Sequence, residues 1–537
     1  MDDWSLAATT QIALLLKLNL FPPAARLIIL ALFLVISTTT LLLKRSAKSK
    51  QRAGPGRRPP GPRKLPVIGN LHQMVGPSLP HRRLADLAQE YGPLMLMELG
   101  EISCLVVSSP EWAKRIMQTH DATFADRSTL PAVDVIFYGG RDIVFAPHGE
   151  FWREMKKVSV VELFGAARVR SFRPIREQET GKLVESIRAH TIASSSATST
   201  PAVNVSRMLI SLGNCITSRA AFGKTGDQKQ VEAVLPYIEE IIETLGVFSL
   251  VDVFPSSKLL RFITRFDTKL KKLHAAADAI METIISDHVA KRSSAKHDDD
   301  DDEDLVDALL NLKDNNDLGF PFTNVEIKAV ILDMFIAGMA TWAVLTEWAM
   351  SELMKNPKIM EKAQKEVRQV FDKKGQVVNE ALLDELHYLQ LVIKETLRLH
   401  PPGPFTIPRK CRKTTVIDGY EIPVGTRVFI NISALGRDPN HWTEPETFNP
   451  ERFLNNPINY NGLDFNFVPF GSGRRMCPAI QYATTIVSFV LANLLYHFDW
   501  KLPNGMRPED IDLKEKSGLE VRRKNNLLLI PIPYYPN

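Results

Sequence analysis

The amino-acid sequence predicts a mainly α protein with a small β component. The helical part rests on apolar residues that recur every three or four positions, which is the period of one helix face. The clearest such stretches are residues 81–92, 111–120, 231–245 and 270–292. Strand-like runs are short, and they fall at residues 94–100, 104–109, 414–432 and 525–533. The 537 residues exceed the about 250–300 at which one core usually stops growing, so we expect one unusually large domain or several.

Composition excludes several classes of protein. Hydrophobic residues make up 45% and charged residues 24% of the chain, which is ordinary for a globular protein. The net charge of +5 is concentrated in one N-terminal stretch, so no nucleic-acid partner is expected. The four cysteines lie far apart, without the paired spacing of a zinc site or a secreted disulfide framework: Cys104, Cys215, Cys411 and Cys477. Free thiols in a reducing compartment are the expectation.

The N-terminal segment predicts a membrane anchor. Residues 27–43 carry no charge and are near the shortest length that spans a bilayer as a helix. Lysines and arginines follow between residues 44 and 58, and positive charge after a span keeps that side cytoplasmic. A cleaved signal peptide is the alternative, although no clear small-residue cleavage site follows. We expect residues 1–44 to form a single-pass anchor with the rest of the chain in the cytosol.

A proline-rich stretch comes next. Residues 57–71 read RRPPGPRKLPVIGNL, and their prolines forbid helix and favour extended geometry. We interpret residues 45–66 as a basic, stiff hinge and residues 67–537 as the catalytic body; an unstructured linker is the alternative. Within the body, the acidic run 298–304 predicts a solvated loop ahead of a helix. The Ser/Thr/Ala-rich stretch 189–202 predicts another loop.

Residues 325–355 give the strongest helix signal of the chain. The segment is too long and too apolar for a surface helix, so most of it should be buried. Ala337 and Gly338 in its middle remove side-chain bulk, which lets the backbone approach something large and flat. The Thr341 hydroxyl can bond back to a carbonyl four residues earlier or bend the helix. Close helix–helix packing at small residues is the alternative interpretation.

A second predicted helix carries an acid and a base on one face. In KETLRLHPP, residues 394–402, Glu395 and Arg398 are three positions apart, and the helix should stop at the two prolines. Fifty residues later the stretch FNPERF supplies Arg452. The expectation is a buried cluster of Glu395, Arg398 and Arg452 in which paired hydrogen bonds offset part of the desolvation cost.

Cys477 lies in FVPFGSGRRMCPAIQYATT, residues 467–485. Gly471 and Gly473 permit a tight turn, and we place Cys477 at the first turn of the helix that follows. There a thiolate would face backbone N–H groups and the positive end of the helix dipole, and Arg475 would reach an anionic group on the same side. Without a second cysteine or a nearby histidine, such a sulfur suits a single protein ligand of an iron porphyrin.

These motifs together resemble those of the cytochrome P-450 superfamily. PFGSGRRMCPA is similar to its haem-binding loop, with Phe470, Gly473, Arg475 and Cys477 in the matching positions and Ala479 in place of the usual final glycine. KETLR and PERF are similar to two further motifs of that family. FAPHGEFWREMKK, residues 145–157, looks like its third helix. Trp152 and Lys156 there match a tryptophan and a basic residue, usually arginine, that contact the haem propionates.

The resemblance covers nearly the whole chain and implies a fold, a cofactor and partners. The fold would be one large helical domain with a small sheet, holding haem b (iron protoporphyrin IX) between the helix around Thr341 and the Cys477 loop. Electrons would come from NADPH through a reductase that docks near Arg474. The resemblance further implies residence in the endoplasmic reticulum membrane, with the catalytic domain on the cytosolic face. TEWAMSELMKNP and RAAFGK resemble the plant A-type clan.

One position departs from the family pattern. Ala340 stands where an acid usually precedes the threonine, so Thr341 must act with water alone in proton delivery. We hypothesise that this change favours dehydrogenation, ring closure or carbon–carbon bond formation; ordinary hydroxylation, with water in place of the carboxylate, is the alternative.

Family position also predicts an apolar, aromatic substrate pocket. Its expected lining residues are Phe137, Leu250, Met339, Trp342, Phe405 and Leu519. Such a pocket suits a terpenoid or a monoterpene indole alkaloid. Two other functions remain open at this point: a haem-thiolate isomerase or dehydratase that needs no O2, and a membrane-anchored binding protein without catalysis.

Overall fold

The computed structural model describes residues 56–128, 130–193, 201–223, 228–245, 249–293, 303–315, 318–375, 377–516 and 518–536. The predicted anchor, residues 1–44, and the first part of the predicted hinge lie outside these residues. Everything below concerns the described part of the chain.

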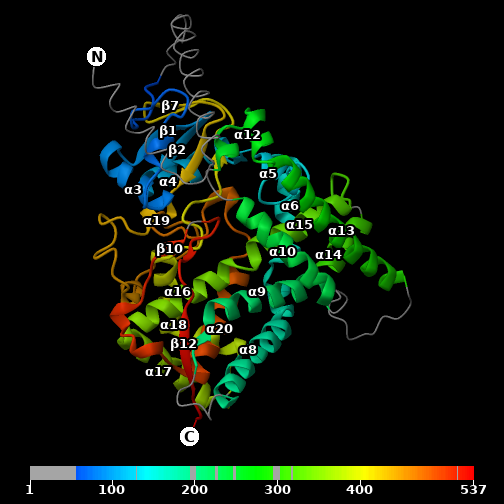
Figure 1. Ribbon diagram of the computed structural model, residues 1–537, viewed down its shortest axis with the longest axis vertical. Helices are drawn as coiled ribbons and strands as arrows, with labels where there is room; N and C mark the ends of the chain where they lie inside the picture. Colours follow the sequence, from blue (N-terminus) through cyan, green and yellow to red (C-terminus); the bar gives the residue numbers. More distant parts are fainter. Residues whose placement is uncertain are drawn as a thin grey trace, which may run out of the picture.

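Helices make up most of the molecule, as the sequence predicts (Figure 1). In chain order they are α3 (Pro80–Tyr91), α4 (Pro110–Lys114), α5 (Pro131–Ile136), α6 (Glu150–Val158), α7 (Ala166–Ser171), α8 (Arg173–Ala193), α9 (Val205–Phe222), α10 (Gln228–Thr244), α11 (Leu250–Val253), α12 (Lys258–Ile263), α13 (Phe266–Ser293), α14 (Leu305–Asn315), α15 (Asn324–Gly338), α16 (Thr341–Lys355), α17 (Pro357–Lys373), α18 (His387–Leu399), α19 (Ile432–Leu435) and α20 (Ile480–His497).

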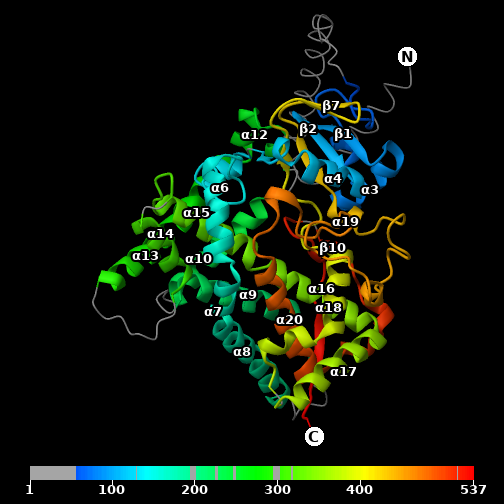
Figure 2. The same ribbon diagram turned by 180° about the vertical axis from the view of Figure 1, so that it is seen from behind.

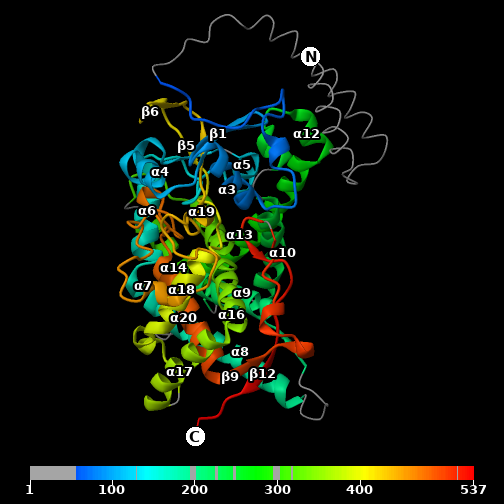
Figure 3. The ribbon, with the colours of Figure 1, turned by 90° about the vertical axis from the view of Figure 1, so that its left-hand side faces the viewer.

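The strands form small sheets at two ends of the body. A five-stranded sheet has the order β1 (Leu94–Leu99), β2 (Ile102–Val107), β8 (Arg427–Ile430), β5 (Arg409–Lys410) and β3 (Asp126–Arg127). Only β2 and β8 within it are parallel. A three-stranded sheet joins β4 (Val203–Asn204), β12 (Leu528–Pro533) and β9 (Phe498–Lys501). The short hairpins are β6 (Thr415–Ile417) with β7 (Tyr420–Ile422), and β10 (Glu515–Lys516) with β11 (Arg522–Arg523). Figure 3 shows β1 and β12 far apart, with the helices between them.

The helix pair α15–α16 runs through the core. Within the part of the chain that the structure describes, Asn324–Lys355 is the one stretch long and apolar enough to cross a membrane. However, 83% of its most apolar window is buried inside the protein, which fits the predicted core helix. Its neighbours α9 and α20 pack against α16.

The core helix is interrupted, where the sequence predicts a single helix over 325–355. α15 ends at Gly338 and α16 begins at Thr341. Thr341 Oγ1 donates a hydrogen bond to the carbonyl of Ala337 at 2.7 Å, so the predicted back-bond is present. The Gly338 carbonyl accepts from Thr217 on α9 at 3.3 Å. The break therefore lies at the small residues that the sequence singles out.

The described part of the proline-rich stretch is packed rather than unstructured. Arg57 bonds to Gly419 beside β7 at 2.9 Å, and the Pro60 carbonyl accepts from Leu96 of β1 at 2.8 Å. Pro59 and Pro62 are buried. Residues 57–69 thus form a strip along one edge of the five-stranded sheet, which ends in a turn at residues 65–69. The alternative of an unstructured linker is wrong for them.

The end of the acidic run is also not a solvated loop. Asp304 is buried and caps α14, because its Oδ1 accepts from the Asp307 amide at 2.9 Å. Its Oδ2 lies 2.9 Å from Nε2 of the buried His288 on α13. Residues 294–302 lie outside the described chain, and so do residues 194–200 of the second predicted loop, whose first residues belong to α8.

Candidate active site

The loop before α20 forms the tight turn that its glycines predict. Gly471 and Gly473 have φ of 72° and 68°, values that residues with a side chain rarely adopt. A Cβ on Gly473 would lie 2.2 Å from the carbonyl oxygen of Met117, so a larger residue is also excluded by space. The Cys477 amide donates to the Phe470 carbonyl at 3.0 Å and closes the loop.

Asp121 fastens this loop to the rest of the molecule. Its carboxylate accepts from the Arg474 backbone amide at 2.9 Å and from Arg409 at 2.6 Å. Arg409 also donates to the Ser472 carbonyl at 2.7 Å. Sequence reasoning missed Asp121 and Arg409, because nothing in their local sequence marks a contact with residues 63 to 353 positions away.

Cys477 lies before α20, not in its first turn. The helix begins at Ile480, so the sulfur precedes it by three residues, and the prediction of a helical position is wrong. The Ala479 amide still bonds to the sulfur, as the prediction of backbone N–H groups requires. Burial raises the pKa of the Cys477 thiol, whereas the Ala479 amide and the nearby Lys156 act to lower it.

Ala337, Gly338 and Thr341 form a small accessible surface in the middle of the otherwise buried core helix. Residues 326–336 of α15 and residues 342–354 of α16 are buried, yet Ala337 is exposed and Gly338 and Thr341 are half-buried. Ala337 and Thr341 are one helical turn apart and therefore lie on the same face. The core helix thus presents small groups to an open space, which is what a large flat ligand needs.

Ile143 connects this helix face with the Cys477 loop. Its amide donates to Asp333 of α15 at 2.8 Å. Its carbonyl accepts from Trp152 Nε1 at 3.1 Å and from Arg475 at 3.4 Å. The core helix, α6 and the Cys477 loop therefore meet at one place, although they are far apart in sequence.

The residues predicted to hold haem carboxylates lie together. The Arg475 guanidinium lies 4.2 Å from the ring centroid of Trp152. Lys156 donates to the Met476 carbonyl at 2.7 Å, and Figure 2 shows the stretch that leads into α20 close to α6. Burial and repulsion from Arg409 lower the pKa of Arg475 to about 10, and burial lowers that of Lys156 to about 8.

Arg127 adds a further cation that sequence reasoning missed. It is buried and donates to the carbonyls of Val144 and Ile407, at 2.9 and 2.6 Å. Burial, and then repulsion from Arg475 and Arg409, lower its pKa. Among the described residues, no carboxylate lies within ion-pair distance of Arg127, Lys156 or Arg475. This surplus of cations fits haem, whose two carboxylates would neutralise it beside a cysteine sulfur.

Glu395 lies at the centre of the predicted acid–base cluster, and all three side chains meet. Its Oε1 accepts from Arg398 at 2.8 Å, from Arg452 at 2.9 Å and from the Asn449 amide at 2.8 Å. Its Oε2 accepts from Arg398 Nε at 2.8 Å. Arg398 also donates to the carbonyls of Gly436 and Pro445, so the cluster ties α18 to the stretch before the Cys477 loop.

The predicted pocket residues do not form one group. Phe137 and Met339 belong to the same hydrophobic cluster, and Leu519 packs against it. Phe405 lies elsewhere, against Phe429 of β8 at a ring distance of 5.8 Å. Two residues are placed differently from the prediction. Trp342 is 2% exposed and packs near Gly213 of α9, and Leu250 is 52% exposed on the outer surface.

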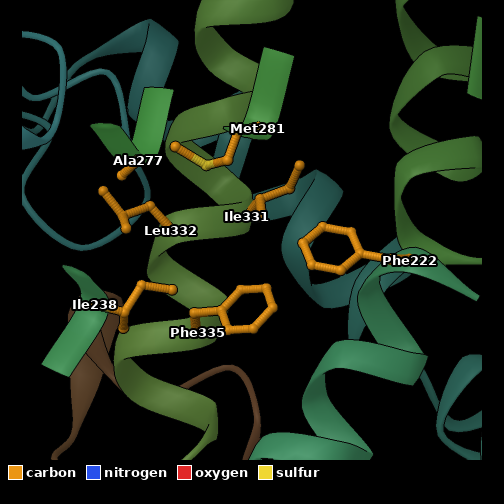
Figure 4. Close-up of a pocket in the computed structure, with 7 residues that line it drawn as sticks. All are labelled: Phe222, Ile238, Ala277, Met281, Ile331, Leu332 and Phe335. Carbon is orange, nitrogen blue, oxygen red and sulfur yellow. The ribbon is translucent and has the colours of Figure 1, made fainter. Parts of the chain in front are cut away.

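A small apolar cavity lies on the other side of α15. Figure 4 shows its lining, to which α9, α10, α13 and α15 all contribute. The lining residues are Phe222, Ile238, Ala277, Met281, Ile331, Leu332 and Phe335. The space between these side chains is too narrow to hold a water molecule. Ile331, Leu332 and Phe335 lie roughly opposite Ala337 around the helix, at about 100° per residue, so the cavity is separate from the Cys477 side.

Comparison with known proteins identifies the family. The cytochrome P-450 family model matches residues 59–530. The chain is 46% identical over 512 residues to desmethyl-deoxy-podophyllotoxin synthase of Sinopodophyllum hexandrum, covering 95% of this chain and 96% of that protein. Premnaspirodiene oxygenase of Hyoscyamus muticus is 46% identical (89% and 93% covered), and costunolide synthase of Cichorium intybus is 44% identical (88% and 92% covered).

A solved structure shares the fold. A zebrafish cytochrome P-450 solved with progesterone superposes with a TM-score of 0.70 at 23% identity, covering 85% of this chain and all of that one. The chain therefore belongs to the cytochrome P-450 family and is a cytochrome P-450 monooxygenase.

Proposed function

We propose that the chain is a membrane-anchored monooxygenase of plant specialised metabolism that oxidises an apolar polycyclic compound, a terpenoid or a monoterpene indole alkaloid. The observation that carries the proposal is the set of groups around Cys477. A single cysteine sulfur, a group of cations without carboxylate partners and a bare segment of the core helix lie on elements that Ile143 joins. Ile143 contacts Asp333 of α15, Trp152 of α6 and Arg475 of the Cys477 loop.

Cys477, Arg475, Trp152 and Lys156 would hold the haem. The Cys477 sulfur would be its protein ligand, and the three other side chains would bind its carboxylates through N–H donors. Phe470 and Gly473 shape the loop that carries the sulfur. Bound haem would supply the activation of O2 and the insertion of one oxygen atom into the substrate.

Thr341 holds the one hydroxyl of this helix segment that can exchange a proton with water. Its O–H donates to the Ala337 carbonyl, which leaves its oxygen lone pairs free to accept from a water molecule. Ala340 provides no carboxylate beside it. Proton delivery would therefore depend on water ordered by Thr341, and such an arrangement favours dehydrogenation or ring closure over simple hydroxylation.

The apolar character of the pocket supports the substrate class. The rings of Phe137 and Phe145 lie 4.8 Å apart, and Leu519 packs against the same hydrophobic cluster. The names of two relatives, costunolide synthase and premnaspirodiene oxygenase, favour a terpenoid.

A reductase would supply electrons from NADPH at the face beside Cys477. Arg474 is exposed on the loop itself, and the exposed Arg153 and Lys157 lie on α6, which contacts the same loop through Lys156. An acidic partner surface fits this group of cations.

We place the protein at the endoplasmic reticulum membrane, with the catalytic domain on the cytosolic face. The anchor predicted at residues 1–44 supports this location, and so does an apolar patch on α11 and α12. The patch consists of Leu250, Leu259, Phe262 and Ile263, and Phe262 is 81% exposed. It lies at the end of the molecule that carries β7 (Figures 1 and 3).

The experiment is turnover of a metabolite panel by the full chain with an NADPH-dependent reductase. We expect NADPH and O2 consumption that depend on an apolar polycyclic substrate, and a far-red-shifted Soret band in the reduced carbon monoxide spectrum. Cys477→Ala should lose both. Product formation without O2 and reductase would instead indicate the isomerase or dehydratase.

A further inference from the structure

Two buried aspartates meet between α15 and the loop that follows α5. Asp142 is 0% exposed and lies in the loop, and Asp333 is 6% exposed and lies on α15. Neither forms an ion pair with a described lysine or arginine. Burial of two unpaired carboxyl groups is costly, so their surroundings call for a physical explanation.

The two carboxyl groups bind four consecutive backbone amides. Asp333 Oδ2 accepts from Ile143 at 2.8 Å and from Val144 at 3.3 Å. Asp142 Oδ1 accepts from Phe145 at 2.8 Å and from Ala146 at 2.9 Å. One oxygen of each aspartate therefore accepts from all four amides of the segment Ile143–Ala146.

The other two oxygens have no donor. Asp142 Oδ2 and Asp333 Oδ1 are buried and receive no hydrogen bond from any N–H or O–H group of the described residues. The two carboxyl groups instead act on one another, and this contact raises the pKa of Asp333 as a hydrogen bond between two carboxyl groups does. Two ionised carboxylates can only accept, so such a bond requires a proton on one of them.

The charges around the pair are unequal. Arg475 and Arg127 face Asp142 and favour its ionised form, but burial outweighs them and raises its pKa to about 7. Burial and repulsion from Asp142 raise the pKa of Asp333 well above its ordinary value. The neighbouring Arg141 pairs instead with Glu326 at the start of α15. The geometry and the charges both indicate a carboxyl pair that keeps a proton at neutral pH.

We propose that Asp142 and Asp333 share a proton and act as positioning residues that hold the segment Ile143–Ala146 against α15. This segment carries the Ile143 and Ala146 carbonyls, which accept from Arg475, and Phe145, whose ring packs on Phe137. The shared proton thus sets the position of one wall of the substrate pocket and of the Arg475–Trp152 group. Only the role of that wall in substrate binding rests on the proposed function.

The contribution of the aspartate pair to the stability of this segment should fall as the pH rises. Both carboxyl groups have raised pKa values in the folded protein, so their contribution to stability is complete below the ordinary range of an aspartate, near 4. It is lost as the pH rises through about 7, where Asp142 ionises, and then further as Asp333 ionises. Alkaline pH should therefore release the segment Ile143–Ala146.

The test is amide hydrogen exchange of the peptide that spans residues 141–151 in the haem-loaded full chain, corrected for the intrinsic pH dependence of exchange. The opening constant is the ratio of the open to the closed form of the segment Ile143–Ala146. In the pH range in which the closed form binds one proton more than the open form, this constant should rise in the wild type by up to about tenfold per pH unit. Asp333→Asn should flatten this slope, because the amide accepts from Ile143 with its oxygen and donates to Asp142 without a shared proton. Asp142→Asn is the reciprocal variant and should flatten it in the same way.

Two controls separate the pair from its neighbours. Arg141→Gln removes the ion pair between this loop and Glu326 of α15, and it should raise the opening constant at every pH while leaving the slope unchanged. Lys156→Met removes a group whose pKa of about 8 falls in the same range. Three results would overturn the proposal. The opening constant of the wild type could be independent of pH, its pH dependence could persist in both asparagine variants, or only Lys156→Met could remove that dependence. Exchange needs no turnover, so an inactive metabolite panel would count against the proposed function alone.

Discussion

At the scale of the residue, the proposed route of proton delivery depends on Ala340 and Thr341. Ala340 is buried at the break between α15 and α16, and the Thr341 hydroxyl is already committed to the Ala337 carbonyl. A carboxyl group at position 340 would add a second proton-exchanging group next to this hydroxyl. General acid catalysis typically contributes about 10²–10⁴-fold to rate, so its presence or absence can change which product forms.

Ala340→Asp should therefore raise the share of hydroxylated product and the fraction of NADPH that is used productively. The measurement is product distribution and coupling with a substrate found in the panel. Ala340→Asn serves as the control, because it has nearly the same size as the acid without its proton. Unchanged products and coupling in Ala340→Asp would mean that water already replaces the carboxylate.

Glu395 supports a prediction about stability. Gln at this position keeps the shape but turns N–H groups toward two guanidinium groups, so buried positive charge is left without a partner. Removing one member of a buried ion pair costs about 3–5 kcal/mol, and Glu395→Gln should lower the free energy of unfolding by that amount. Loss of the carbon monoxide signature in urea measures it.

The matched control is Glu451→Gln. Glu451 also pairs with a cation, Lys362 at 2.9 Å, but both side chains are partly exposed, at 40% and 52%. A pair of this kind contributes about 0–1 kcal/mol. Equal losses for the two variants would show that the burial of Glu395 adds nothing.

Single residues could be predicted from the sequence where their partners are close by or share a known spacing. Glu395 and Arg398 are three positions apart, and the turn around Gly473 and Cys477 is local. Asp333 binds the Ile143 amide 190 positions away, and Arg127 binds a carbonyl 280 positions away. No local pattern marks such residues, because their roles exist only after the chain has folded.

At the scale of the element, the closest contact of the core helix is with α9. Gly213 of α9 touches the break in the core helix: a Cβ there would lie 2.1 Å from the Met339 carbonyl oxygen and 3.5 Å from the Trp342 ring. This contact explains why Trp342 is packed between helices rather than in the predicted pocket. The sequence predicted the small residues at the break but not the helix that meets them.

Gly213→Ala should push α9 away from the break. Overpacking of this kind typically costs about 1–3 kcal/mol, and we expect a lower melting temperature and weaker retention of haem. Gly181→Ala on α8 is the control, because no atom lies within 4 Å of the added carbon. That variant should be neutral or stabilising by up to about 1 kcal/mol. A fully stable Gly213→Ala protein would contradict the close contact.

At the scale of the whole molecule, periodicity predicted a mainly helical body, and the structure confirms it. The order of strands in the sheets could not be predicted from the sequence, because short pairs such as β3 with β5 depend on long-range contacts that no local pattern shows. Leu250 illustrates the same limit. An apolar residue predicts burial, yet this one belongs to an exposed patch with Phe262 and Ile263.

The patch supports a prediction about membrane binding. Phe262→Ser together with Ile263→Ser removes its most exposed apolar groups without touching the core. We expect the variant to remain in the membrane fraction through its anchor but to lose protection of α12 from added protease in microsomes. Val424→Ser, at another exposed apolar residue, is the control. Equal cleavage of all three proteins would show that α12 does not contact lipid.

The strip formed by residues 57–69 has a consequence for anyone who wishes to crystallise this enzyme. The Pro60 carbonyl accepts from Leu96 and Gly69 pairs with Leu99, so the strip covers the rim of the five-stranded sheet at β1, whereas Arg57 pairs with Tyr420 of the separate β6–β7 hairpin. A shortened chain that starts ahead of Gly56 keeps that rim closed. A chain that starts at Leu71 would leave backbone N–H and C=O groups of β1 unpaired, and these groups would bind other copies of the protein and cause aggregation.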